Sequence, residues 1–191
     1  MKIIVTGGTG LIGRPLVKEL AADDHQIIIL TRRPGKNRPE FPANVQFVGW
    51  DAKTVGDWAQ EVDGADVIIN LAGESIGGDN FLPDRWTEDK KKRIRQSRLD
   101  AGQAMVKAIH MAQQKPEVLL QPSGIGYYGP RGDEWMTEET PPAQDFLASV
   151  CADWETAVDG VQKLGVRLVV MRIGLVQTRV TACWEGEAPA E

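Results

Sequence analysis

Short apolar runs alternate with longer amphipathic stretches along most of the chain. The short runs are rich in valine, isoleucine and leucine, which is typical of strands buried on both faces of a parallel sheet. The longer stretches repeat apolar residues every three or four positions, which predicts helices that cover this sheet. The predicted strands are residues 2–6, 26–31, 45–48, 66–71, 118–121 and 167–172, and the predicted helices lie in residues 11–20, 87–114 and 146–164.

This alternation predicts an α/β fold of three layers, αβα, built around a doubly wound parallel sheet of the Rossmann type. Right-handed crossovers between successive strands place helices on both faces of such a sheet. Nothing in the composition divides residues 1–176, so we expect them to form one domain. Residues 177–191 have neither strand nor helix periodicity, and we expect an atypical, disordered tail there.

The overall charge narrows the range of partners. The formal net charge is −5 and the pI is about 5.2, which argues against general binding to nucleic acid.

A membrane-spanning helix needs about 20 apolar residues in a row, and no such run occurs, which argues against a membrane protein. Cys151 and Cys183 share no metal-ligand spacing, so no metal site is expected. The first residues reach Gly7 too soon for a signal peptide, and we expect a cytoplasmic protein.

A glycine-rich turn joins the first predicted strand to the first predicted helix. Residues 6–13 read Thr-Gly-Gly-Thr-Gly-Leu-Ile-Gly. Gly7 permits the tight turn, Gly10 lets the backbone approach a pyrophosphate, and Gly13 lets the helix pack against the sheet. The alternative is a glycine turn that binds nothing, but the strand–turn–helix context favours a dinucleotide site. The expected cofactor contacts from this turn are Gly7, Thr9, Gly10, Leu11 and Ile12.

The end of the second predicted strand is basic. It reads Thr31-Arg32-Arg33, and Lys36 and Arg38 follow closely. An enzyme that uses NAD places an acid there for the ribose hydroxyls, and an acid would repel the 2′-phosphate of NADP. Arginine instead attracts phosphate and can bind it through two parallel N–H donors. The alternative is a solvated basic loop. We expect Thr31, Arg32 and Arg33 to bind the adenosine half of NADP(H).

Three separate motifs together resemble the extended-type short-chain dehydrogenase/reductases. They are the glycine turn of residues 6–13, Asn-Leu-Ala-Gly at residues 70–73, and a segment that starts at Ser123 and closes in Tyr-Tyr-Gly at residues 127–129. The phrases Asn-Leu-Ala-Gly-Glu, Arg-Trp-Thr and Gly-Tyr-Tyr-Gly resemble the atypical, epimerase-like branch of that superfamily more specifically. The resemblance covers residues 1–176.

The resemblance implies an NADP(H)-binding oxidoreductase or epimerase with a small-molecule substrate, and nucleotide-linked compounds are one candidate class. It implies that Asp51 lies near the adenine, that Leu71, Ala72 and Gly73 line the cofactor, and that Val176 approaches the nicotinamide end. It also implies that the family's C-terminal substrate domain, which would follow Val176, is missing. Apolar surface left by such a domain favours self-association, so a homo-oligomer is possible.

The chain departs from the superfamily at its catalytic pair, a tyrosine and a lysine four residues later. Aligned on Trp154-Glu155, those positions are Leu147 and Cys151. Leucine has no proton to give, and an unperturbed cysteine is not a cation. Two hypotheses follow: an oxidoreductase with a non-standard active site, and a catalytically weak NADP(H)-binding sensor or regulatory protein.

Two hydroxyl groups are candidates for catalysis. Ser123 ends the fifth predicted strand, where doubly wound sheets bind ligands. Tyr128 could donate a phenol proton from the same loop. The alternatives are a serine that only closes a turn and an aromatic side chain that only packs.

Two charged residues are candidates for binding. Arg98 falls on the apolar stripe of its helix, which also holds Ile94 and Met105, so its guanidinium needs an anion or a carbonyl as partner. We expect that partner to be the cofactor or the substrate, and the alternative is an arginine whose head group reaches solvent at the edge of the stripe. Glu74 is either an acid in the cleft or a loop carboxylate.

Overall fold

A computed structural model describes residues 1–36, 38–77 and 86–176 of the chain. Within these residues six strands form one parallel sheet in the order β3-β2-β1-β4-β5-β6. This is the doubly wound Rossmann order and confirms the predicted fold class. The strands are β1 (Lys2–Thr6), β2 (Gln26–Thr31), β3 (Val45–Gly49), β4 (Val67–Asn70), β5 (Val118–Gly124) and β6 (Arg167–Ile173).

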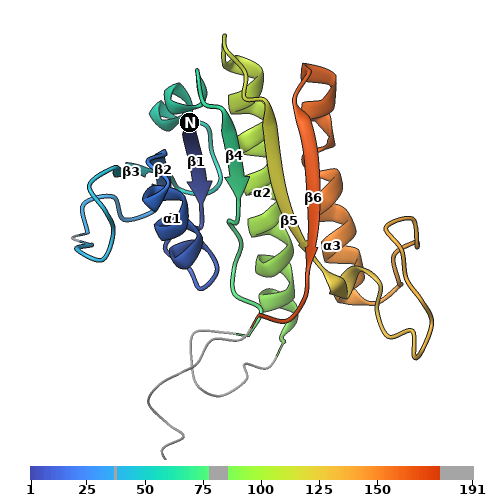
Figure 1. Ribbon diagram of the computed structural model, residues 1–191. Helices are drawn as coiled ribbons and strands as arrows, with labels where there is room; N and C mark the ends of the chain where they lie inside the picture. The colour runs from blue at the N-terminus through green and yellow to red at the C-terminus, as the bar shows by residue number, and fades with distance from the viewer. Residues whose placement is uncertain (37, 78–85, 177–191) are drawn as a thin grey trace, which may run out of the picture.

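Helices cover both faces of the sheet, which gives the three expected layers (Figure 1). Helix α1 (Gly13–Ala22) packs on one face, while α2 (Glu88–Met111) and α3 (Phe146–Thr156) pack on the other. Alternate residues of each strand therefore enter two separate cores, with Ile3 and Val5 on the α1 side and Ile4 on the α2 side. Short 3-10 helices lie at η1 (Asp57–Val62), η2 (Ile125–Tyr127) and η3 (Asp159–Leu164).

Local chemistry fixes where the long helices begin. Thr87 caps α2, because its side chain accepts a hydrogen bond from the Lys90 N–H, and Asp145 caps α3 in the same way toward Ala148. No helix in the described part of the chain is both long and apolar enough to cross a membrane.

Two helix predictions need correction. The first helix begins at Gly13, so Leu11 lies in the preceding turn and is 57% exposed. The predicted helix of residues 146–164 is two elements, because α3 ends at Thr156 and the 3-10 helix η3 follows. Asp159 and Gly160 are poor helix formers, which favours the end of the α-helix before them. The burial of Val158 and Val161 in the core then sets the 3-10 conformation of the backbone.

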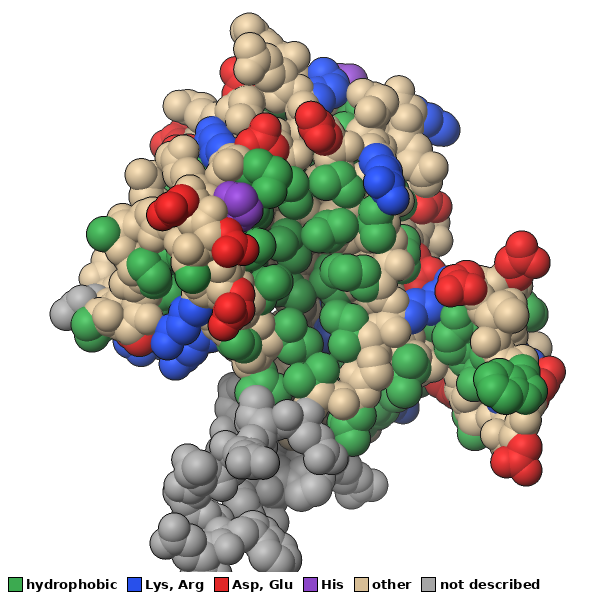
Figure 2. Space-filling model, in the orientation of Figure 1, with side chains coloured by type: hydrophobic (Ala, Val, Ile, Leu, Met, Phe, Trp, Pro, Cys, Tyr) green, Lys and Arg blue, Asp and Glu red, His purple; other side chains and the backbone are tan. Residues whose placement is uncertain are grey.

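The two faces of the sheet are not equally covered. Every residue of β6 except the exposed Arg167 is only half-buried, whereas the interior positions of β1 and β2 are buried. Hydrophobic side chains gather on the face that α1 leaves uncovered beside β5 and β6 (Figure 2). The predicted tail of residues 177–191 lies outside the described residues.

Candidate cofactor-binding site

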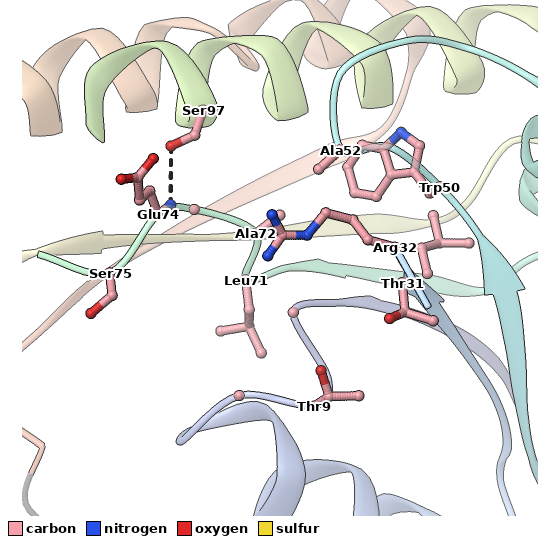
Figure 3. Close-up of a pocket in the computed structure, with 14 residues that line it drawn as sticks. Thr9, Thr31, Arg32, Trp50, Ala52, Leu71, Ala72, Glu74, Ser75 and Ser97 are labelled. Carbon is pink, nitrogen blue, oxygen red and sulfur yellow. Dashed lines mark hydrogen bonds between the residues drawn. The ribbon is translucent and has the colours of Figure 1, made fainter. Parts of the chain in front are cut away.

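A cleft of about 610 Å³ lies at the carboxyl ends of β1, β2 and β4 (Figure 3). The chain crosses from β3 to the far side of β1 to form β4, so the strand order reverses at this point. Open α/β sheets bind ligands where the order reverses. The cleft is lined by Gly7, Thr9, Gly10, Leu30, Thr31, Arg32, Trp50, Ala52, Leu71, Ala72, Gly73, Glu74, Ser75 and Ser97.

The glycine turn forms the floor of this cleft and fits a pyrophosphate. Gly7 has a φ of +64°, and a Cβ there would lie 2.7 Å from the Leu71 carbonyl oxygen. The Gly10 N–H donates to the Gly7 carbonyl at 2.9 Å, which closes the turn. A Cβ at Gly13 would collide with the Gly7 carbonyl, so glycine is required for α1 to approach the sheet. No side chain caps α1, but the Arg14 N–H already donates to the Gly10 carbonyl at 3.0 Å and Pro15 has no N–H, so an anion at this helix start would meet the N–H groups of the turn before Arg14.

One end of the cleft is basic. Arg32 extends between Thr31 and Trp50 into the cleft (Figure 3). Arg38 is used differently: it donates to the Arg33 carbonyl at 2.8 Å and lies over the Phe47 ring, which holds the basic loop in shape. Of the residues that line the cleft, Glu74 is the only acid, and it lies at the opposite end (Figure 3).

A buried chain of hydrogen bonds holds the central strands in register beneath the cleft. The Thr6 hydroxyl donates to the Asn70 side-chain oxygen at 2.9 Å and accepts from the Ala72 N–H at 2.9 Å. The Asn70 amide donates to the Gln121 side-chain oxygen at 2.9 Å. Thr6, Asn70 and Gln121 are fully buried. This network fixes the segment after β4 that lines the cleft, and no local sequence pattern predicted it.

Arg98 lies directly behind that segment. It is 7% exposed, as its place on the apolar stripe predicted, and one guanidinium nitrogen donates to the carbonyls of Glu74 and Ile94 at 3.1 and 2.9 Å. Burial lowers the pKa of Arg98 from its ordinary value. A Cβ on Gly73 would lie 3.2 Å from the Arg98 guanidinium carbon, so the glycine permits this approach. Arg98 itself does not line the cleft.

The end of β5 differs in chemistry from the cleft. Ser123 is 5% exposed, and its hydroxyl makes no hydrogen bond of good geometry among the described residues, although it lies near enough to the Cys151 thiol to lower that group's pKa. Cys151 lies beside Gly124, and burial raises the pKa of its thiol. Leu147 packs against Gly126. Leu147 and Cys151 therefore face the end of β5 and the turn after it, where Leu147 has no proton to donate and the Cys151 thiol is not a cation.

Tyr128 belongs to a separate cluster around Arg172. Its hydroxyl accepts a hydrogen bond from Arg172 at 2.8 Å, and Arg172 also pairs with both carboxylate oxygens of Glu155 at 3.0 and 2.9 Å. The hydrogen bonds to Glu155 raise the pKa of Arg172. The Tyr127 ring lies 3.6 Å from the guanidinium carbon. Neither tyrosine lines the cleft. No local sequence pattern predicted the Arg172–Glu155 pair, which joins β6 to α3.

Five other predicted cofactor contacts do not line the cleft. They are Leu11, Ile12, Arg33, Asp51 and Val176. The Asp51 carboxylate turns back to accept hydrogen bonds from Lys53 and Thr54. The bond from the Thr54 hydroxyl is the main reason that the pKa of Asp51 is lowered. Val176, the last described residue, is 41% exposed.

A family model described as the NAD dependent epimerase/dehydratase family matches residues 3–176. The chain belongs to this family. Its glycine turn, its strand order and the Asn-Leu-Ala-Gly wall of the cleft all lie within the matched residues. The expected resemblance to epimerase-like short-chain dehydrogenase/reductases is thereby confirmed.

Several members of this epimerase family are similar over most of the chain. An Arabidopsis thaliana protein named epimerase family protein SDR39U1 homolog, chloroplastic, is 37% identical over 178 residues, which are 92% of this chain and 49% of that protein. The structure of human epimerase family protein SDR39U1 with NADPH is 31% identical, with a TM-score of 0.71 over 90% of this chain and 53% of that one.

A third relative is the nucleoside-diphosphate sugar epimerase of Corynebacterium glutamicum. Its structure is 32% identical, with a TM-score of 0.70 over 90% of this chain and 33% of that one. The chain spans about half the length of the curated relatives that it matches.

Proposed function

We propose that this domain binds NADP(H) in preference to NAD(H). The observation that carries the proposal is Arg32, which extends into the cleft at the end of β2 where an NAD-binding protein places an acid. Two unit charges about 4 Å apart at an effective dielectric of about 20 interact by roughly 4 kcal/mol. The human relative, whose structure was solved with NADPH, supports the same choice.

Different residues of the cleft would contact different parts of the cofactor. Arg32 and Thr31 would hold the 2′-phosphate, and Trp50 and Ala52 would face the adenine. The backbone of residues 7–10 would hold the pyrophosphate against the start of α1. When bound, the nicotinamide supplies a site that accepts or donates a hydride.

Titration of the purified chain with NADPH and NADH tests the proposal. We expect NADPH to bind at least about tenfold tighter, since one charge-assisted contact contributes at least about 1.4 kcal/mol. A second pair, 2′,5′-ADP and 5′-ADP, isolates the 2′-phosphate. Equal affinities within both pairs would show that Arg32 is only part of a solvated basic loop.

We further propose that the whole protein is an epimerase-like oxidoreductase that acts on a small polar, nucleotide-linked substrate. Membership of the epimerase family supports the reaction class, and the Corynebacterium relative, named a nucleoside-diphosphate sugar epimerase, supports the substrate class. Ser123 and Tyr128, both near the carboxyl end of β5, are the hydroxyl groups that such chemistry would use.

A second candidate is an NADP(H)-binding sensor or regulatory protein with little catalysis. The specific observation in its favour is that α3 presents Leu147 and Cys151 toward the end of β5 and the turn after it, where the superfamily has its proton donor and its cation. Turnover of NADPH with a panel of carbonyl compounds and nucleotide sugars separates the two candidates. Oxidation of NADPH by any member of the panel favours the enzyme, and tight binding without turnover favours the sensor.

A further inference from the structure

Glu74 is held by α2 at three separate points. The Ser97 hydroxyl accepts a hydrogen bond from the Glu74 N–H at 3.0 Å, and Arg98 donates to the Glu74 carbonyl at 3.1 Å. Arg93 donates from Nε to the Glu74 carboxylate oxygen Oε1 at 3.0 Å. These three contacts fix both the backbone and the carboxylate of Glu74 relative to α2.

The carboxylate remains available to a ligand. Glu74 lines the cleft, and its side chain is 35% exposed. Arg93 occupies Oε1, while Oε2 makes no hydrogen bond to another described residue. The ion pair is exposed and weak on its own, but it offsets the negative charge that Glu74 would otherwise present to a pyrophosphate.

The position of Glu74 in the cleft identifies the part of the cofactor that it would meet. Thr31 and Arg32 follow β2, the glycine turn follows β1, and Glu74 follows β4. Because β1 lies between β2 and β4 in the sheet, these three segments lie in that order across the cleft. Figure 3 shows Arg32 and Trp50 at one end and Glu74 and Ser75 at the other. A dinucleotide with its 2′-phosphate at Arg32 would therefore extend its nicotinamide half toward Glu74.

We infer that the Glu74 carboxylate accepts hydrogen bonds from the hydroxyl groups of the ribose that carries the nicotinamide. A ribose offers two adjacent O–H donors, and a carboxylate is the side chain that accepts both most strongly. The inference rests on the proposed binding of NADP(H). It assigns a positioning role to the loop after β4, which α2 holds in place through Ser97 and Arg98.

Two ligands that differ in the nicotinamide half test the assignment. NADPH contains the nicotinamide ribose, and 2′,5′-ADP ends before it. In the variant Glu74→Gln we expect NADPH to bind about tenfold more weakly, because the hydrogen bonds lose their charge assistance. The affinity for 2′,5′-ADP should stay within about twofold of that of the unaltered chain.

Controls keep the outcomes separate. Glu134→Gln makes the same chemical change on an exposed loop and should leave both affinities unchanged. If Glu74→Gln does not fold, Glu74→Asp replaces it, because the shorter side chain keeps the charge but retracts from the cleft. Unchanged NADPH affinity, or equal weakening of both ligands, would overturn the role of Glu74 alone. Failure of both ligands to bind the unaltered chain would instead overturn the proposed function, and this inference with it.

Discussion

The cleft and the end of β5 differ in what the chain places there. The cleft combines a glycine turn, a basic strand end and exposed polar groups, which suits a dinucleotide. At the end of β5, Ser123 and Cys151 are buried, Cys151 lies beside Gly124, and Leu147 packs against Gly126. The difference shows that separate elements build the two regions, since β1, β2 and β4 end at the cleft while α3 packs on the end of β5.

The strongest test of the cleft as the NADP(H) site is charge reversal at Arg32. Arg32→Asp replaces attraction for the 2′-phosphate by repulsion, and an interaction of about 4 kcal/mol allows a change of about a hundredfold or more in NADPH affinity. NADH should then bind better than NADPH, as fluorescence titration of both cofactors would show. Arg33→Asp is the matched control, because Arg33 lies beside the cleft without lining it. Equal effects of both variants would mean that a diffuse basic field, and not Arg32, selects the phosphate.

The end of β5 is tested by replacing Cys151 with the lysine that the superfamily has at this position. Cys151→Lys would bury a cation beside Gly124 and near the positive Arg98, at a cost of about 3 kcal/mol of the free energy of unfolding. Urea denaturation followed by circular dichroism measures this loss, and Cys151→Ser should lose much less. A lysine variant as stable as the unaltered protein would show that α3 can still accommodate the standard pair.

Arg98 connects the two regions, since it contacts the cleft wall on one side and Trp154 of α3 on the other. Arg98→Ala removes the charged hydrogen bond that fixes the Glu74 carbonyl behind the cleft, so it should weaken NADPH binding only indirectly, by less than the roughly 2 kcal/mol of a direct charged contact, with an unchanged far-ultraviolet spectrum. Arg95→Ala removes an α2 arginine that pairs with Asp153 and Ser149, away from the cleft, and should leave the affinity unchanged. Unaltered affinity in Arg98→Ala would limit Arg98 to packing.

The smallest expected effect concerns the Cys151 thiol. Burial raises its pKa, so the native protein holds less thiolate at pH 8 than the unfolded chain. In a Cys183→Ser background, alkylation of the native protein should be at least about tenfold slower than alkylation in urea. As pH rises through the ordinary thiol range, the unfolded chain ionises first, so this group should lower stability at alkaline pH. Fast alkylation of the native protein would mark Cys151 as a reactive group instead.

Features that depend on neighbouring residues in the sequence were predicted well. The glycine turn, the basic end of β2 and the buried side of α2 that holds Arg98 all follow from local spacing. The break after Thr156 was missed, because helix periodicity continues through it while packing of Val158 and Val161 sets the backbone. The hydrogen-bonded chain of Thr6, Asn70 and Gln121 was missed because its members are 51 and 64 positions apart.

The sequence by itself determined the order of the elements, the class of the fold and the sign of the charge at the end of β2, because each depends on residues within one strand, turn or helix. The tertiary structure alone decided that α2 holds Glu74 at the end of the cleft opposite Arg32 and that Arg172 pairs with Glu155. Those contacts depend on which strands become neighbours in the sheet, since parallel strands bring together side chains that no short sequence pattern relates.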